Sequence, residues 1–210
     1  MTVINGIMLL RIYLLDRPKL IVEPISPDAY QWFCILPDGE YRGQKTRRYG
    51  YLAYIDMANK GLRNVSLRSW RLLLKTIDGK PLELEPLSIP LPEIQFPKSG
   101  IVKRYPVLGV KSLDYDGSTM IASGSSTSGW AYYVVQVCGG PEWNPAMKEG
   151  RSAGKIVVQS IFGDKSSTQI VFREVALEKL SQMIQGFESI GLDDPIITTQ
   201  TNIQSKRNDR

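Results

Sequence analysis

The residue types that most often carry chemistry in proteins are scarce in this chain of 210 residues. It contains no histidine and only two cysteines, Cys34 and Cys138. Histidine is the usual base of Ser-His-Asp and Cys-His enzymes and a common zinc ligand, so these chemistries are excluded. Two cysteines cannot build a disulfide framework, and we expect two buried free thiols, with a single cross-sheet bridge as the alternative.

The remaining motifs that could carry a reaction are weak. Gly150 to Lys155 only superficially resembles a phosphate-binding loop, because it has too few intervening residues and Ile156 replaces the metal-binding hydroxyl residue. Asp114 and Asp116 fit a polar turn better than a Ca²⁺ loop, whose terminal glutamate is absent. We therefore expect no enzyme, no cofactor and no metal site.

The sharpest local excess of positive charge lies in residues 40–51, EYRGQKTRRYGY. The candidate binding residues there are Arg42, Lys45, Arg47, Arg48 and Tyr49. Cations neutralise phosphates and aromatic rings stack on bases, so the segment offers nucleic-acid binding as one alternative. The formal net charge of +5 is only mildly basic. Since no nucleic-acid-binding motif accompanies the segment, we favour a solvated loop that leads into a strand at Tyr51.

Two aromatic residues in other loops, Tyr115 and Trp143, could anchor a protein partner. Together with the missing catalytic set, they favour a non-enzymatic binding or accessory module that engages a protein through loops or edge strands. Nucleic-acid binding through residues 40–51 is the alternative. A third hypothesis is a carbohydrate-binding or carbohydrate-active sandwich that uses Trp143, Tyr115 and an acid such as Glu142.

Two extended segments within residues 51–75 form the clearest structural pattern, separated by Asn59-Lys60-Gly61. Asparagine and glycine enter positive φ more readily than other residues, so these three residues predict a tight, hairpin-like reversal.

The apolar residues after this reversal change parity midway along the second segment. The early ones are Val65 and Leu67, and the later ones are Trp70, Leu72 and Leu74. Because side chains alternate between the two faces of a strand, this switch predicts a β-bulge or a crossing between sheets near Arg68 and Ser69.

Strand patterns recur through the rest of the body. Trp32–Leu36 is a short apolar run that the turn residues Pro37-Asp38-Gly39 are expected to close. Residues 81–97 hold five prolines and should run as an edge or surface connection. Trp130–Cys138 reads as a central, buried strand, and residues 155–172 as a hairpin around Gly163-Asp164-Lys165.

The N-terminal residues 1–15 are strongly apolar but contain Arg11, and they fall short of the roughly 20 residues that span a bilayer. We slightly favour a helix or strand packed on the body over an interfacial membrane anchor or part of a membrane span. Arg17 and Lys19 follow the segment, so insertion would leave the body in the cytoplasm, at the inner face of the membrane.

These patterns predict a mainly β protein, an Ig-like or related antiparallel β-sandwich with one C-terminal amphipathic helix. Strand density and the expected burial of Trp70 carry the resemblance to Ig-like domains, although the cysteine spacing departs from the antibody pattern. We expect three regions: the apolar segment 1–18, a single domain 19–191 that ends in a helix containing Leu177 to Phe187, and a disordered tail 192–210.

Overall fold

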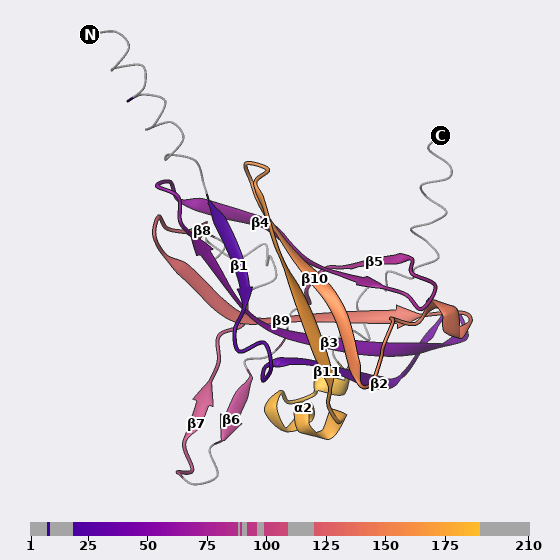
Figure 1. Cartoon of the computed structure of the whole chain (residues 1–210). Helices are drawn as coiled ribbons and strands as arrows, with labels where there is room; N and C mark the ends of the chain where they lie inside the picture. Colours follow the sequence, from indigo (N-terminus) through magenta and orange to yellow (C-terminus); the bar gives the residue numbers. More distant parts are fainter. Residues whose placement is uncertain are drawn as a thin grey trace, which may run out of the picture.

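The computed structural model describes residues 19–87, 89, 92–95, 99–108 and 120–189, together with Met8. These residues form a mainly β protein with one large mixed sheet, a small two-stranded hairpin and one short C-terminal helix (Figure 1). The elements are β1 (Leu20–Pro24), β2 (Gln31–Tyr41), β3 (Gln44–Asn59), β4 (Val65–Lys75), β5 (Pro81–Leu84), β6 (Glu93–Gln95), β7 (Val102–Arg104), β8 (Met120–Ile121), β9 (Ser126–Val137), η1 (Pro141–Trp143), β10 (Arg151–Ser160), β11 (Lys165–Glu174), α2 (Leu177–Met183) and η2 (Phe187–Ser189).

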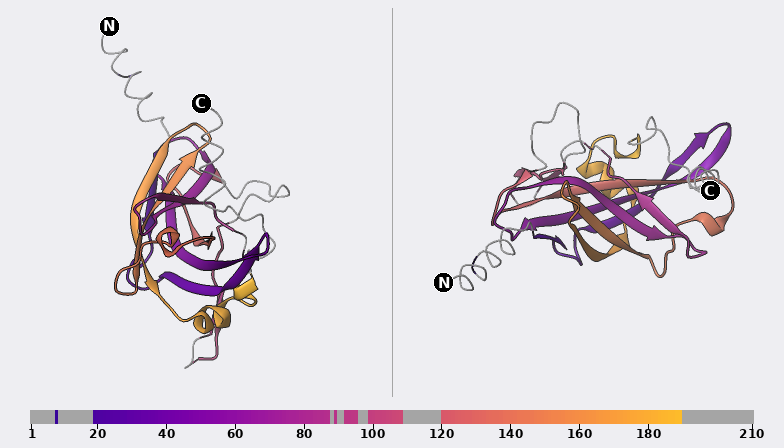
Figure 2. Two further views of the ribbon diagram at one scale, coloured as in Figure 1. Left: turned by 90° about the vertical axis from the view of Figure 1, so that its right-hand side faces the viewer. Right: turned by 90° about the horizontal axis from the view of Figure 1, so that it is seen from above.

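The large sheet has the strand order β1-β3-β2-β11-β10-β4-β5, with β9 paired to β3 and β8 paired to β4. It is mixed because β11 runs parallel to β2, whereas the other pairs are antiparallel. Figure 2 shows that the sheet is strongly bent. Beyond β5, the amide of Leu87 donates to the carbonyl of Tyr132 in β9 at 2.7 Å, so the two ends of the sheet approach each other.

Strand β3 is the organising element of this sheet. One of its edges pairs with β9 from Arg47 to Ala58. The opposite edge is shared, because β2 pairs with residues 44–53 and β1 with residues 55–59. A strand with neighbours on both edges can bury both of its faces, and the side chains from Arg48 to Ala53 are all buried.

Two apolar clusters lie on opposite faces of β2, β3 and β9. The inner cluster fills the concave side of the bent sheet and includes Phe33, Tyr51, Trp70, Tyr133 and Phe172. The outer cluster contains Trp32, Cys34, Leu36, Leu52, Trp130 and Tyr132, and it is covered by Leu180, Ile184 and Phe187 of the C-terminal segment. The predicted C-terminal amphipathic helix is present, but it ends at Met183 rather than Phe187, because Ile184 is extended and Phe187 lies in η2. The helix and η2 together cover one face of the sheet.

The bulge predicted near Arg68 is confirmed. In the pairing of β10 with β4, Gln159 faces Ser69 and Ser160 faces Leu67, so Arg68 is the extra residue. The inserted residue shifts the register and lets both Leu67 and Trp70 point into the inner cluster. The hairpin expected over residues 155–172 is also confirmed, because β10 and β11 pair in antiparallel register from Arg151↔Arg173 to Gln159↔Lys165.

Two turn predictions are wrong. The segments before and after Asn59 are not a hairpin, because β3 pairs with β1, β2 and β9 whereas β4 pairs with β5, β8 and β10. Neither Asn59 nor Gly61 has a positive φ. Pro37-Asp38-Gly39 is not a chain reversal either; it is an irregularity in register within the continuous strand β2.

Cys34 and Cys138 are both free and buried, as expected. Burial raises the pKa of the Cys34 thiol to about 12. Among the described residues, no helix is long and apolar enough to cross a bilayer. The N-terminal segment, apart from Met8, and the expected C-terminal tail lie outside the described residues.

Candidate functional site

The basic segment 40–51 belongs to a β-hairpin rather than to a loop, which corrects the expectation from sequence. Tyr41 pairs with Gln44, and the reversal is made by Arg42 and Gly43, with φ of 51° and 77°. The Arg42 guanidinium lies 5.2 Å from the centre of the Tyr41 ring. Arg42 and Lys45 are exposed, so the hairpin tip presents two cations to solvent.

Strand alternation divides the other candidate residues of this segment between two faces of β3. Tyr49 points into the inner cluster and is 5% exposed, whereas Arg48 points to the opposite face and is 0% exposed. Burial raises the pKa of the Tyr49 hydroxyl. Neither side chain is accessible to a ligand at the surface in this conformation.

Arg48 lies in a buried polar group between the sheet and η2. Its Nη1 donates to the carbonyl of Glu188 at 3.4 Å, and burial lowers the pKa of its guanidinium. Gln136 and Thr46 are hydrogen-bonded to each other through their side chains beside it. A Cβ on Gly39 would lie 2.9 Å from Arg48 Cδ, so the absence of a side chain at Gly39 leaves room for the arginine stem. Arg48 therefore has a structural role, because it connects the sheet to the C-terminal segment.

Arg47 connects the basic hairpin to the loop that follows β9. Its Nη2 donates to the carbonyls of Gly139 and Gly140 at 2.7 and 2.8 Å. The basic hairpin and the loop after β9 therefore lie side by side at one end of the molecule, as Figure 1 shows. Arg47 is half-buried and its Nη2 is engaged by these two carbonyls, so it stabilises this junction.

Trp143 is half-buried and packs against the inner cluster rather than projecting from its loop. Lys80 Nζ lies 3.8 Å from the centre of its ring. The loop is held to the end of β4 and the turn after it, because the amide of Ile77 donates to the carbonyl of Asn144 at 2.9 Å. The structure thus brings Arg47 and Trp143 to the same end but gives both of them structural contacts. Tyr115 lies outside the described residues.

The small hairpin formed by β6 and β7 was not anticipated from sequence as a separate element. It pairs Glu93 with Arg104 and Gln95 with Val102, and it projects from the body in Figure 1. The exposed fractions of Ile101 and Val102 are 61% and 51%. A clue in the sequence was the Val-Lys-Arg-Tyr run after the proline-rich stretch, which mixes strand-forming and charged residues.

The hairpin is attached to the body at its base. Tyr105 donates its amide to the carbonyl of Pro92 at 3.0 Å and packs edge-on against Tyr54, with ring centres 6.1 Å apart. The amide of Trp130 then donates to the carbonyl of Pro106, and the amide of Leu108 donates to the carbonyl of Trp130. The ion pair between Arg104 and Glu93 is exposed and adds little.

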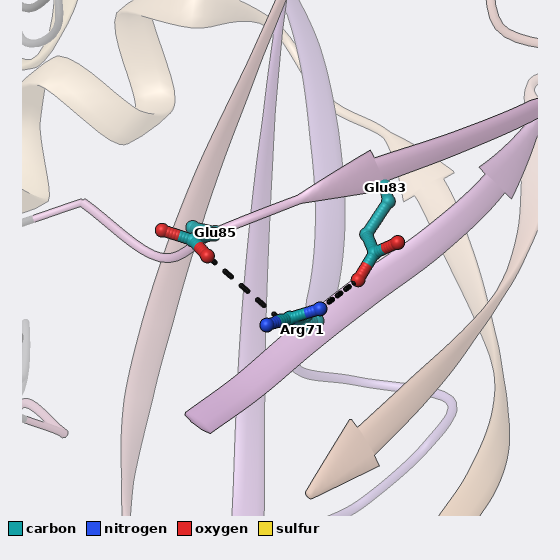
Figure 3. Close-up of polar contacts among 3 residues, drawn as sticks. All are labelled: Arg71, Glu83 and Glu85. Carbon is teal, nitrogen blue, oxygen red and sulfur yellow. Dashed lines mark hydrogen bonds and ion pairs between the residues drawn. The ribbon is translucent and has the colours of Figure 1, made fainter. Parts of the chain in front are cut away.

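Two edges of the large sheet, the outer edges of β9 and β5, are protected by comparison. The outer edge of β9 is bonded to Leu87, Pro106 and Leu108. At the other end, β5 is short and begins with Pro81, and Glu83 of β5 and Glu85 just after it lie beside Arg71 of β4 (Figure 3). The hydrogen bond from Arg71 to Glu83 raises the pKa of the guanidinium. Short, charged, proline-containing edges resist the addition of another strand.

Within the part of the chain that the structure describes, no group of three or more potential metal-ligating residues is present. The acid considered for carbohydrate chemistry, Glu142, lies half-buried in η1 beside Trp143. Tyr115, the second aromatic residue of that hypothesis, lies outside the described residues.

No protein-family model matches this chain, and no curated protein sequence matches it significantly. The similar solved structures include the structural genomics target SoR45, with 14% identity over 78% of this chain and 90% of that chain and a TM-score of 0.28. A Bordetella pertussis protein assigned as ApaA has 12% identity over 76% of this chain and 96% of that one, with a TM-score of 0.30. The archaellum periplasmic stator protein FlaG from Sulfolobus acidocaldarius has 11% identity over 67% of this chain and 99% of that one, with a TM-score of 0.24. Similarities at this level carry no conclusion about activity or partners.

Proposed function

We propose that this protein is a non-enzymatic binding module that engages a protein partner through the β6–β7 hairpin. In this proposal the domain has an Ig-like or related sandwich organisation, works in the cytoplasm and associates with the inner face of a membrane. The bent sheet with apolar clusters on both faces supports the scaffold role, because it provides a rigid body from which a small hairpin projects.

The observation that carries the proposal is the contrast between the hairpin and the outer edges of β5 and β9. Among the described residues, β6 and β7 pair only with each other, so each leaves one backbone edge without a strand partner. The edges of β5 and β9 are short and charged or already bonded. An exposed edge accepts an extended segment of another chain by β-augmentation, and neighbouring apolar side chains add specificity.

The low intrinsic stability of a two-stranded hairpin also supports a partner strand at this site. An isolated two-stranded hairpin is marginally stable in water, because it has too few contacts to offset the ordering of its backbone. Here the anchoring contacts lie at its base, around Tyr105. Ile101 and Val102, at the outer part, remain exposed, so a partner strand would both bury them and complete the hydrogen bonding.

Site-specific photocrosslinking in the cells that produce the protein tests this proposal. A photoreactive amino acid at Val102 should give a crosslinked adduct of defined mass, whereas the same group at Gln169, exposed on β11, should not. Both sites lie on exposed strand surfaces, so Gln169 controls for non-specific capture. Absence of an adduct at Val102, or equal adducts at both positions, would contradict the assignment of the hairpin.

A further inference from the structure

Four large apolar side chains are exposed together at the end of the molecule where β3 passes into β4. They are Leu62, Met120, Ile161 and Phe162, with exposed fractions of 61%, 53%, 54% and 64%. We refer to these four residues as the loop-tip surface. They come from three separate connections: the β3–β4 loop, the start of β8, and the β10–β11 turn.

Hydrogen bonds hold the first two connections together around Asn59. Its Nδ2 donates to the carbonyls of Arg63, Ile121 and Ala122 at 2.6, 3.2 and 3.3 Å. The Oγ of Ser123 donates to the carbonyl of Gly61 at 2.8 Å. Asn59, predicted from the sequence to be a turn residue, thus links the two loops through its side chain.

The third connection is fixed to the same place through Ser66. Ser66 pairs with Met120 of β8, and its carbonyl accepts the amide of Ile161 at 3.0 Å. Within the turn, Ser160 Oγ accepts the amides of Phe162 and Asp164 at 3.1 and 3.2 Å. The exposed apolar residues therefore stand on a backbone that is already ordered, so burying them would cost little additional conformational entropy.

The chain enters the described domain at this same end. The carbonyl of Lys19 accepts the amide of Lys60 at 2.8 Å, and β1 begins at the next residue with Leu20 opposite Asn59. The preceding residues 1–15 are the most apolar stretch of the sequence. The described chain thus begins at the end of the molecule that carries the loop-tip surface, and the apolar stretch precedes this point in the sequence.

Among the described residues near the loop-tip surface, the exposed charges are predominantly positive. The exposed cations are Lys19, Lys60 and Arg63 in connecting segments and Lys165 at the start of β11. The acid of the β10–β11 turn, Asp164, is only partly exposed and lies 3.4 Å from Ser160 Oγ. Apolar side chains surrounded by cations match the boundary between acyl chains and anionic headgroups.

We propose that the loop-tip surface docks on an anionic lipid bilayer and inserts Ile161 and Phe162 into it. This inference rests on the membrane association included in the proposed function and names the surface that meets the lipid. It places the body on the membrane with the β10–β11 turn and the β3–β4 loop as contacts. Two signals, an apolar segment and a basic apolar patch, bind a membrane more stably than either alone.

The decisive experiment uses the full-length chain. Phe162→Cys, labelled with an environment-sensitive fluorophore, is mixed with phosphatidylcholine vesicles with and without phosphatidylglycerol. Val171→Cys, 47% exposed on β11, is the matched control. Labelling favours the introduced cysteines because Cys34 and Cys138 are buried. We expect a blue shift at position 162 that requires the anionic lipid, and no shift at position 171.

A second variant measures how much the surface contributes. Ile161→Ser combined with Phe162→Ser should lower the affinity of the full chain for anionic vesicles, measured by co-sedimentation, by about tenfold for each side chain. Val171→Ser should leave it unchanged. Both substitutions affect exposed residues, so circular dichroism should remain that of the parent protein.

The possible failures are distinguishable. If the parent chain binds vesicles but position 162 shows no shift, the docking surface is wrong while membrane association stands. If the parent chain binds no vesicles, both membrane association and this inference fail, while crosslinking at Val102 still tests the protein partner. A shift at position 162 without lipid, accompanied by a doubled mass in solution, would identify the surface as a contact between two copies and overturn the inference.

Discussion

Tyr51 and Tyr132 are two fully buried tyrosines whose hydroxyl groups have different surroundings. Tyr51 Oη lies 3.2 Å from Ser152 Oγ, and Ser152 Oγ donates to the carbonyl of Ala146 at 3.2 Å. Among the described residues, no group hydrogen-bonds to the hydroxyl of Tyr132. Burial raises the pKa of both hydroxyls above the ordinary range for tyrosine. Comparing these two tyrosines therefore separates the effect of burying a hydroxyl on the free energy of unfolding from the effect of its hydrogen bond.

We expect Tyr51→Phe to lower the free energy of unfolding by about 1 kcal/mol, because it removes the bond to Ser152. Tyr132→Phe should leave it unchanged or raise it, since the substitution removes a buried hydroxyl without a described partner. Urea denaturation at neutral pH measures both values. An equal loss in the two variants would show that the Tyr132 hydroxyl is satisfied in solution.

The residue scale also shows where sequence reasoning about the site succeeded and failed. The sequence shows the cations of residues 40–51 close together along the chain, but the prediction of a loop there gives no strand alternation by which to assign them to faces. Once β3 is seen to begin at Gln44, alternation alone places Arg48 and Tyr49 on opposite faces. The burial of Arg48 could not be predicted, because it depends on the distant η2 segment that covers it.

At the scale of elements, local pattern predicted strands better than it predicted their partners. The bulge at Arg68 was evident because the parity of apolar residues is a local property. The apparent β3–β4 hairpin was wrong because pairing depends on which edges other strands occupy. Here β9 takes one edge of β3, and β1 and β2 share the other.

The attachment of the β6–β7 hairpin gives a prediction at this scale. A Cβ on Gly129 would lie 3.0 Å from both the amide nitrogen of Leu108 and the carbonyl oxygen of Pro106. Gly129→Ala should therefore push the base of the hairpin from β9, destabilise the protein by about 1–3 kcal/mol and accelerate amide exchange over residues 102–108.

Gly154→Ala is the matched control for this prediction. Its Cβ would lie 2.8 Å from Leu74 Cδ2, so it crowds a leucine of the inner cluster without touching the hairpin. Hydrogen exchange measured by mass spectrometry should show little change over residues 102–108 in this variant. The same acceleration in both variants would mean that amide exchange over residues 102–108 depends on the global stability of the protein rather than on the local contact with β9.

At the scale of the whole molecule, the two apolar clusters share the strands β2, β3 and β9. Several ionisable groups are buried in these strands and remain protonated: Cys34, Tyr49, Tyr51, Tyr132 and Tyr133. Burial raises the pKa of each of them. In the unfolded chain these groups ionise near 9.0 for cysteine and 10.0 for tyrosine.

The folded protein should therefore lose stability in alkaline solution. Above about pH 9 the unfolded chain releases protons that the folded protein retains, so the free energy of unfolding falls as pH rises. Each group contributes a slope of up to about 1.4 kcal/mol per pH unit.

Denaturation midpoints at about pH 8 and about pH 10.5 measure this decline. Cys34→Ala combined with Tyr132→Phe should make it shallower, because two of the groups are removed. A midpoint that stays constant over this range would contradict the prediction.

The sharing of β3 among three strands also has a consequence for biosynthesis. Strands β1 and β2 precede β3 and can pair with it as soon as it emerges, but β9 follows only after β4 to β8. Until Ser126 and the following residues of β9 have left the ribosome, the whole β9-facing edge of β3 has no native partner. At ordinary elongation rates this interval lasts on the order of several seconds. During that interval β3 has an unpaired edge with which a strand of another chain can pair.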